Sequence, residues 1–252
     1  MPLWKAVIVP LKTEGSMPEF PVGHPPVSFS AEAGTAESAV AKDLEDFHKK
    51  LLVASPTYKR SVEKATSPKP VIVTVTNEPL HAGASAISQD CNTYHSIAIN
   101  PYVIFDKRPL RNAAPKHKNE ARESLIFEMQ NAATVREMAM IDNAAARGAF
   151  RHPVAGRGPL PESSKVLLRG NPDKAHDEAA VWYARAVEDR EWRNHANLVK
   201  VEKEIAQSPK IENLEDVYPF NPNFEEALAE QIKFGHTQSY LDAYDRLTKK
   251  ST

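Results

Sequence analysis

The chain has 252 residues, with 32 Lys or Arg and 33 Asp or Glu, so it is long enough for one large domain and its balanced charge gives no reason to expect a nucleic-acid partner. Its single cysteine, Cys91, excludes an intramolecular disulfide framework and a cysteine-based zinc ribbon. No stretch approaches the roughly 20 apolar residues of a membrane span, and the apolar run at residues 6–9 is too short for a signal peptide. We therefore expect a cytoplasmic protein, or one exported by a route without a signal peptide.

Proline marks the N-terminal part of the chain. Pro18, Pro21, Pro25 and Pro26 fix backbone angles and remove hydrogen-bond donors. Residues 1–33 are therefore predicted to form a proline-rich arm, and residues 34–252 a single α+β domain.

The first half of that domain shows one clear helix and a short series of strands. Apolar residues at helical spacing predict a helix over residues 35–54, and a polar connection is expected at residues 55–69. The β-branched run at 71–76 predicts a strand, and the alternation at 94–100 predicts a second. Residues 77–90 are rich in turn-forming residues.

The second half is expected to be helical. A central helix is predicted from about residue 119 to 143, followed by a long loop at 147–170 that is rich in Gly and Pro. A long helix starting near Asp173 and ending near residue 206 comes next, and two short helices at 223–234 and 236–248 complete the chain. The predicted fold class is α+β, predominantly helical, with a small sheet of two to four strands in the first half followed by several helices.

The central helix carries the chain's main chemical signal, Phe127-Glu128-Met129-Gln130-Asn131. This segment resembles the active helix of zincin metallopeptidases, in which His-Glu-x-x-His places two imidazoles on one helix face around zinc. The glutamate is kept here and both histidines are replaced. The resemblance implies a zincin-like core with a degenerate motif, and any metal site would need most of its ligands from elsewhere.

An ordinary core helix is the alternative for the same residues. Leu125, Met129, Ala132 and Ala133 have helical spacing and would form an apolar stripe. On this interpretation Glu128 is a polar residue at the flank of the stripe.

The long helix contains a second arrangement of interest. Glu188, Glu191 and His195 are spaced three and four residues apart, so they share one face and could hold a divalent cation or form an acid–base pair. In zincins whose third ligand is a glutamate, that ligand comes from a helix downstream of the active helix. The resemblance implies Glu188 or Glu191 for this role.

The same helix also permits a simpler interpretation. Arg185, Arg190 and Arg193 lie close along the helix, so Glu188 and Glu191 would form surface ion pairs with them. The Trp and Tyr side chains of this helix are expected to pack it against the fold and not to line a groove.

Cys91 lies four residues before His95, which raises a thiol nucleophile as a further possibility. Its position beside apolar strands favours a small buried residue instead. The glycine-rich phosphate motifs and the Gly-x-Ser-x-Gly elbow are absent from the sequence.

Two functions from different classes follow, and whether the chain is an enzyme stays open. In the first, it is a metal-independent binding or interaction protein without a cofactor, whose partner is an unknown protein or peptide. In the second, it is a peptidase-like hydrolase in which Glu128 is the general base, Asn131 and His195 assist, and zinc or another divalent cation is held by Glu188, Glu191 and His195. The first is preferred because no complete catalytic set is present. A cleft across which Glu128 faces Glu188, Glu191 or His195 would reverse this preference.

Overall fold

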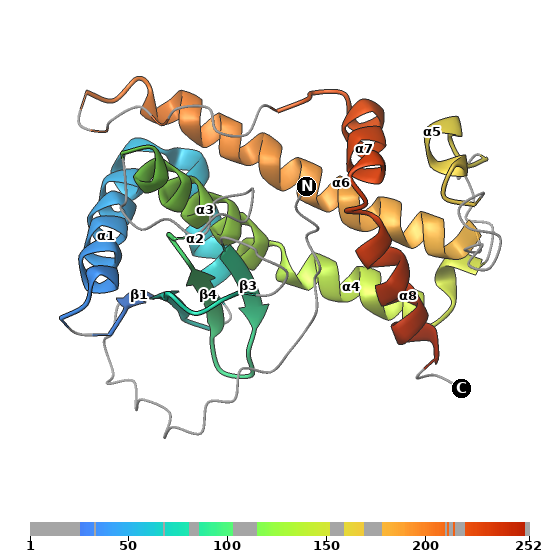
Figure 1. Ribbon diagram of the computed structural model, residues 1–252, viewed down its shortest axis with the longest axis horizontal. Helices are drawn as coiled ribbons and strands as arrows, with labels where there is room; N and C mark the ends of the chain where they lie inside the picture. The colour runs from blue at the N-terminus through green and yellow to red at the C-terminus, as the bar shows by residue number, and fades with distance from the viewer. Residues whose placement is uncertain are drawn as a thin grey trace.

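The computed structural model describes residues 26–32, 34–67, 69–80, 86–102, 115–151, 159–168, 178–209, 211, 214 and 220–249. Most of the predicted proline-rich arm lies outside these ranges, as do residues 152–158, 169 and 170 of the loop predicted at 147–170. The described parts of that loop contain two short helices, which the sequence did not predict. The described chain is α+β and mostly helical, with its sheet in the first half, as the sequence predicts (Figure 1). Its elements are, in chain order, β1 (Val27–Ser30), α1 (Ala36–Ala54), α2 (Pro56–Thr66), β2 (Val71–Val75), β3 (Ala86–Asp90), β4 (His95–Ile99), α3 (Pro115–Ala133), α4 (Val135–Ala146), the 3-10 helix η2 (Ala149–Arg151), α5 (Glu162–Lys165), α6 (Glu178–Ile205), α7 (Phe224–Lys233) and α8 (Gln238–Lys249).

The sheet has four strands in the order β1-β2-β4-β3, with β1, β2 and β4 parallel and β3 antiparallel to β4. Val71, Val73 and Val75 of β2 are buried, because alternate side chains face the helices that cover the sheet. The strands β2 and β4 confirm the two predictions. β1 lies inside the span assigned to the arm, and β3 lies in the segment assigned to turns, so the sheet is wider than its two clearest strands.

Two helices lie where the sequence predicts one helix and a connection. α1 confirms the first, whereas the connection at 55–69 is wrong, because α2 occupies it. Ser55 accepts a hydrogen bond from the backbone N–H of Tyr58 and so caps α2, and Pro56 stands at its first position, where proline is tolerated. Glu204 of α6 accepts further bonds from the Thr57 backbone (3.1 Å) and hydroxyl (2.6 Å), which ties the start of α2 to α6.

The predicted central helix is interrupted at Thr134, which separates α3 from α4. The backbone of Thr134 leaves the helical region at φ −110° and ψ 11°. Its hydroxyl donates to the carbonyl oxygen of Gln130 at 2.9 Å, a local bond that competes with regular helix geometry. α3 therefore stays against the sheet while α4 leads towards α8 (Figure 1).

Two groups of buried apolar side chains form the core. The first, here called the sheet cluster, joins the four strands, α1, α2, α3 and the C-terminal part of α6, and includes Leu44, Val73, Ile97 and Leu125. The second, here called the helical cluster, joins α4, α8 and the N-terminal part of α6. α6 is the element that belongs to both, and Figure 1 shows it crossing the molecule from one cluster to the other.

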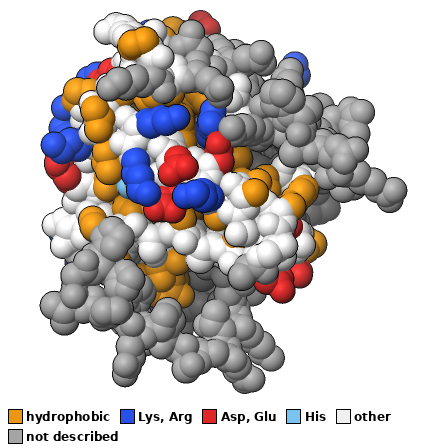
Figure 2. Space-filling model, turned by 90° about the vertical axis from the view of Figure 1, so that its left-hand side faces the viewer, with side chains coloured by type: hydrophobic (Ala, Val, Ile, Leu, Met, Phe, Trp, Pro, Cys, Tyr) orange, Lys and Arg blue, Asp and Glu red, His pale blue; other side chains and the backbone are white. Residues whose placement is uncertain are grey.

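The outer face of α1 is mixed in charge. Figure 2 shows this end of the molecule, where basic and acidic side chains lie next to one another. Lys49 lies 2.6 Å from Glu45, and Lys42 lies 4.0 Å from Asp46. Within the described residues, none of the helices has the length and apolar character needed to cross a membrane.

Candidate functional site

A pocket of about 230 Å³ lies between α3, α6, α7 and the segments next to α7, and it is here called the central pocket. Its wall has an apolar part and a carboxylate part. The apolar part consists of Phe127, Trp192, Leu198, Phe220, Phe224, Ala227 and Leu228. The carboxylates are Glu123, Glu128, Glu188, Glu191 and Glu230, and the other polar residues are Ser124, His195, Asn221, Gln231 and His236.

The middle turns of α6 explain why polar groups gather at this place. Residues 179–187 of α6 enter the helical cluster, and residues 198–205 enter the sheet cluster. Between them, Glu188, Arg190 and Asn194 are buried although they are polar. Buried polar groups require hydrogen-bond partners, and α3, α4 and the α7–α8 junction supply them.

Glu128 is the most perturbed carboxyl of the pocket. Only 3 % of the residue is exposed, and this burial raises the pKa of Glu128 to about 7, although hydrogen bonds from Asn131 and Ser88 act in the opposite direction. The charge of Glu191 raises the pKa further, while Arg190 lowers it. The apolar stripe of the alternative interpretation is confirmed, because Leu125, Met129 and Ala132 are buried in the sheet cluster, but Glu128 is buried as well and is not an exposed flank residue.

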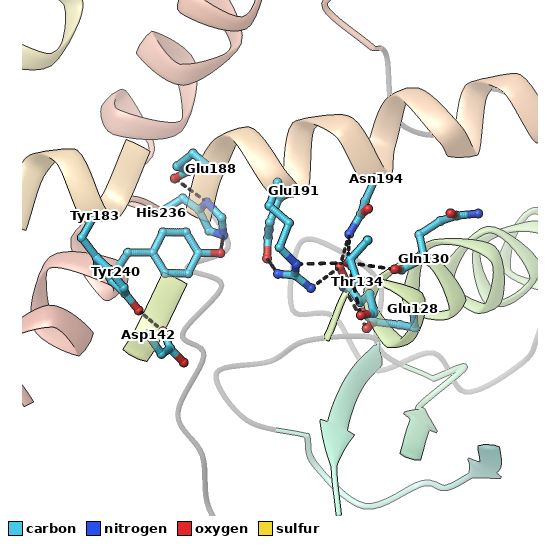
Figure 3. A network of polar contacts seen from close by, with 12 residues as sticks. Glu128, Gln130, Thr134, Asp142, Tyr183, Glu188, Glu191, Asn194, His236 and Tyr240 are labelled. Carbon is cyan, nitrogen blue, oxygen red and sulfur yellow. Dashed lines mark hydrogen bonds and ion pairs between the residues drawn. The ribbon is translucent and has the colours of Figure 1, made fainter. Parts of the chain in front are cut away.

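Asn131 is not among the residues that line the pocket, but it hydrogen-bonds to Glu128. Its side-chain nitrogen donates to Glu128 Oε2 at 3.1 Å. Its oxygen accepts from Asn194 Nδ2 at 2.8 Å and from Arg190 Nη2 at 3.2 Å, so the orientation of the carboxamide is fixed at both ends. Arg190 Nε also donates to the Thr134 hydroxyl at 3.1 Å. Figure 3 shows these side chains linking α6 to the end of α3.

A second buried pair lies at the other end of the pocket. His236 Nδ1 lies 3.1 Å from Glu188 Oε1, which also accepts from the Thr237 hydroxyl at 2.8 Å. Desolvation lowers the pKa of His236, but the hydrogen bond and charge of Glu188 outweigh it, so the pKa is raised overall. Tyr240 stands beside this pair, with its hydroxyl 3.5 Å from His236 Nε2, and also bonds to Glu191 (Figure 3).

The surface ion pairs expected along α6 are only partly present. Glu188 is buried and bonds to His236 and Thr237, so its assignment as a surface ion pair is wrong. Arg185 pairs with Glu225 of α7 at 2.5 Å. Glu191 remains near Arg190, at 3.9 Å.

Aromatic rings form much of the apolar wall. Trp192 packs against Phe220 and Phe224 with centroid distances of 5.7 and 5.8 Å. His195 lies edge-on to Phe220 at 5.3 Å and to Phe127 at 6.4 Å. The expectation that no aromatic side chain of α6 lines a groove is therefore wrong for Trp192.

The pocket brings together most of the residues that the sequence singled out. Glu128, Glu188, Glu191 and His195 all line it, and Asn131 stands behind Glu128. Among the described residues, however, no three His, Cys, Asp or Glu side chains are placed to hold one metal ion. A cation held by Glu188, Glu191 and His195 stays a prediction to which this geometry adds nothing.

Other site residues were not found from the sequence. Arg190 was assigned to a surface ion pair, and Asn194, Thr134, His236 and Tyr240 were not considered. Their roles depend on contacts between α6 and elements that are far away in the sequence. Cys91 stands apart from the central pocket, beside Tyr94 in the β3–β4 turn.

Comparisons with models of protein families, with curated proteins and with solved structures found no match to this chain.

Proposed function

We propose that this chain is a metal-independent binding protein, on a degenerate zincin-like scaffold, whose ligand enters the central pocket. The observation that carries the proposal is the pocket itself, which combines an aromatic wall with several buried ionisable side chains. Ligand sites are typically concave and largely apolar, with a few polar groups that fix orientation. An apolar cavity of about 150 Å³ holds a benzene molecule, so about 230 Å³ is room for a ring with a short chain, or for one side chain of a peptide partner.

Two alanines of α7 provide a matched test. Ala227 lines the pocket, whereas Ala229 is on the same helix but exposed and outside the lining. We expect Ala227→Trp to fill the pocket and abolish saturable binding of small aromatic probes, measured by ligand-observed NMR. Ala229→Trp should bind like the wild type. The proposal fails if none of the phenylpropyl amine, alcohol and carboxylate probes binds the wild type, or if Ala227→Trp binds them equally well.

A peptidase-like hydrolase with Glu128 as general base is the second candidate. It is favoured by one observation: Glu128 lines the same pocket as Glu188, Glu191 and His195, and burial brings its pKa to about 7, near the optimum for a general base. Water would lose a proton to Glu128 as its oxygen attacks a carbonyl carbon, and Glu128 would pass that proton to the amine nitrogen as the C–N bond breaks. The negative charge that develops on the carbonyl oxygen requires donors or cations. The described lining has Ser124, Asn221 and Gln231 as neutral donors, but its five glutamates oppose that charge and it has no Lys or Arg. We therefore place binding first.

The hydrolase has its own test. Hydrolysis of a mixed peptide library should fall by roughly 100-fold or more in Glu128→Gln, and the wild-type rate should rise with pH through the pKa of Glu128. The matched control is Glu63→Gln, on the exposed side of α2 and outside the pocket. Absence of turnover by the wild type, or full turnover by Glu128→Gln, would remove this candidate.

A further inference from the structure

We infer that the central pocket binds an organic cation, with an ammonium or amidinium group on an apolar or aromatic body. This inference rests on the proposed binding function and adds the chemical class of the ligand. It comes from three features of the wall: its aromatic rings, its carboxylates and the way in which its histidines are already engaged.

The aromatic wall suits both parts of such a ligand. Trp192, Phe220 and Phe224 pack together at centroid distances below 6 Å on one side of the pocket. Their edges and faces offer apolar surface to a ring or chain. Aromatic faces also attract cations, with tryptophan the best of them, and this attraction is strongest where water is excluded.

The carboxylates give the pocket a negative lining. Glu128 and Glu188 are almost fully buried, Glu191 is half-buried, and Glu230 is exposed at the rim. No Lys or Arg is found among the described lining residues. Although His236 and Arg190 offset part of this charge, the carboxylates remain in excess, so a cation entering the pocket is attracted and an anion of the same size is repelled.

The cationic groups near the lining are directed to other partners. His236 is bonded to Glu188, and the four other lining acids are Glu123, Glu128, Glu191 and Glu230. Arg190 donates to Asn131 and Thr134 behind the wall, and its Nη1 lies 3.9 Å from Glu191, so it offsets part of the charge of that one carboxylate. Arg185 pairs with Glu225 and stacks over Phe224 at 5.4 Å. The charge balance on the pocket side therefore stays negative.

Three probes of equal shape test the charge preference directly: phenylpropylamine, phenylpropanol and phenylpropanoate. They are titrated into the full chain at about pH 8, where the amine is protonated and Glu128 is mostly ionised. We expect the amine to bind about tenfold or more tighter than the alcohol, because charge-assisted hydrogen bonds to carboxylates are roughly twice as strong as neutral ones, and we expect no binding of the carboxylate. Isothermal titration calorimetry gives all three affinities.

Variants locate the charge that is responsible. Glu191→Gln should weaken the amine by about fivefold to tenfold and leave the alcohol unchanged, and Glu63→Gln should change neither. Glu230→Gln, at the exposed rim, provides a second variant if Glu191→Gln does not fold. It should weaken the binding of the amine by about twofold.

The outcomes separate this inference from the function on which it rests. If the alcohol or the carboxylate binds as tightly as the amine, the cation preference is wrong while the binding function stands. If none of the three probes binds, the binding function itself fails. If amine binding is unchanged in both Glu191→Gln and Glu230→Gln, the carboxylates are not its partners and the inference is overturned.

A comparison of two peptides identifies the source of the cation. A capped tripeptide with a central Lys is compared with the same peptide carrying norleucine, which has an apolar chain of similar length and no charge. Tighter binding of the Lys peptide than of phenylpropylamine assigns the pocket to a peptide side chain, and the reverse order assigns it to a free amine. Binding of the norleucine peptide as tight as that of the Lys peptide contradicts the cation preference.

Discussion

The two apolar clusters differ from the region between them in what their side chains require. Leu44, Val73 and Leu125 in the sheet cluster and Leu241 in the helical cluster need only close packing. The middle turns of α6 instead bury Glu188, Arg190 and Asn194, each of which needs a particular partner. The comparison teaches that one helix can bury apolar side chains at both ends and polar side chains in its middle, because α3, Thr134 and the α7–α8 junction supply hydrogen-bond partners there.

The largest expected effects come from the clusters themselves. Leu44→Ala and Leu241→Ala each remove a fully buried side chain and should each cost about 2–5 kcal/mol of unfolding free energy. Since α6 belongs to both clusters, both variants should shift one common unfolding transition, measured by circular dichroism and tyrosine fluorescence in urea. Two separate transitions, each sensitive to one variant, would show that α6 does not couple the clusters. Val53→Ala, at an exposed position, is the control.

The next effect concerns the buried acid in the pocket. Because the folded state raises the pKa of Glu128 from 4.5 to about 7, the folded protein holds its proton more tightly than the unfolded chain, and stability falls as pH rises from about 4.5 through 7. Glu128→Gln removes this loss and should stabilise the protein by roughly 3 kcal/mol at about pH 8, with little effect at about pH 5. Chemical denaturation at both pH values measures it. A gain of equal size at both would disprove the assigned titration.

Arg190 and Arg193 give a matched pair on α6. Arg190 is buried and bonds to Asn131 and Thr134, so Arg190→Met should cost about 2 kcal/mol and raise the pKa of Glu128. Arg193 is 45 % exposed and pairs with Glu137 and Asp189, so Arg193→Met should cost less than about 1 kcal/mol. Urea unfolding gives the two costs, and NMR titration of the Glu128 carboxyl gives the pKa. Equal costs would mean that burial of the polar middle of α6 has no energetic consequence.

The smallest effect tests the junction of α2 and α6. Hydrogen bonds from Ser55 and Thr57 outweigh the desolvation of Glu204 and lower its pKa, so its contribution to stability is present above about pH 4.5 and is lost as pH falls. Glu204→Gln should cost about 1 kcal/mol at neutral pH, as expected for a group that bonds to a helix N-terminus. Thermal unfolding across pH measures the difference. A cost that increased towards acid pH would contradict the assigned sign, which is opposite to that of Glu128.

Strong local patterns made much of the fold predictable. The β-branched run of β2 and the apolar spacing of α1 and α8 were found because each pattern extends over the whole element. α2 was missed because its apolar residues are few and prolines flank it, and β3 was missed because Ser88 and Gln89 give it little apolar character. The break at Thr134 combines a local bond to the Gln130 carbonyl with bonds from Arg190 and Asn194, and no local pattern reveals the latter two.

Only some members of the candidate site were predictable, and its setting was not. Helical spacing placed Glu188, Glu191 and His195 near one another, and the degenerate motif directed attention to Glu128. Whether these side chains are buried or exposed was decided by α7 and Phe220, which come later in the chain. Sequence spacing could not choose between a surface ion pair and a buried bond, because that choice depends on tertiary packing.

The position of α6 in both clusters also limits how the chain can vary in length. The apolar stripe of the helical cluster ends at Val187, and that of the sheet cluster begins at Leu198. These two residues are 11 positions apart, which is close to three full helical turns. Insertion or deletion of one residue between them would rotate one stripe by about 100° relative to the other, so both clusters could not be packed at once. The number of residues in the pocket-lining turns is therefore fixed by the two cores, whereas the chemical character of the side chains that line the pocket is not.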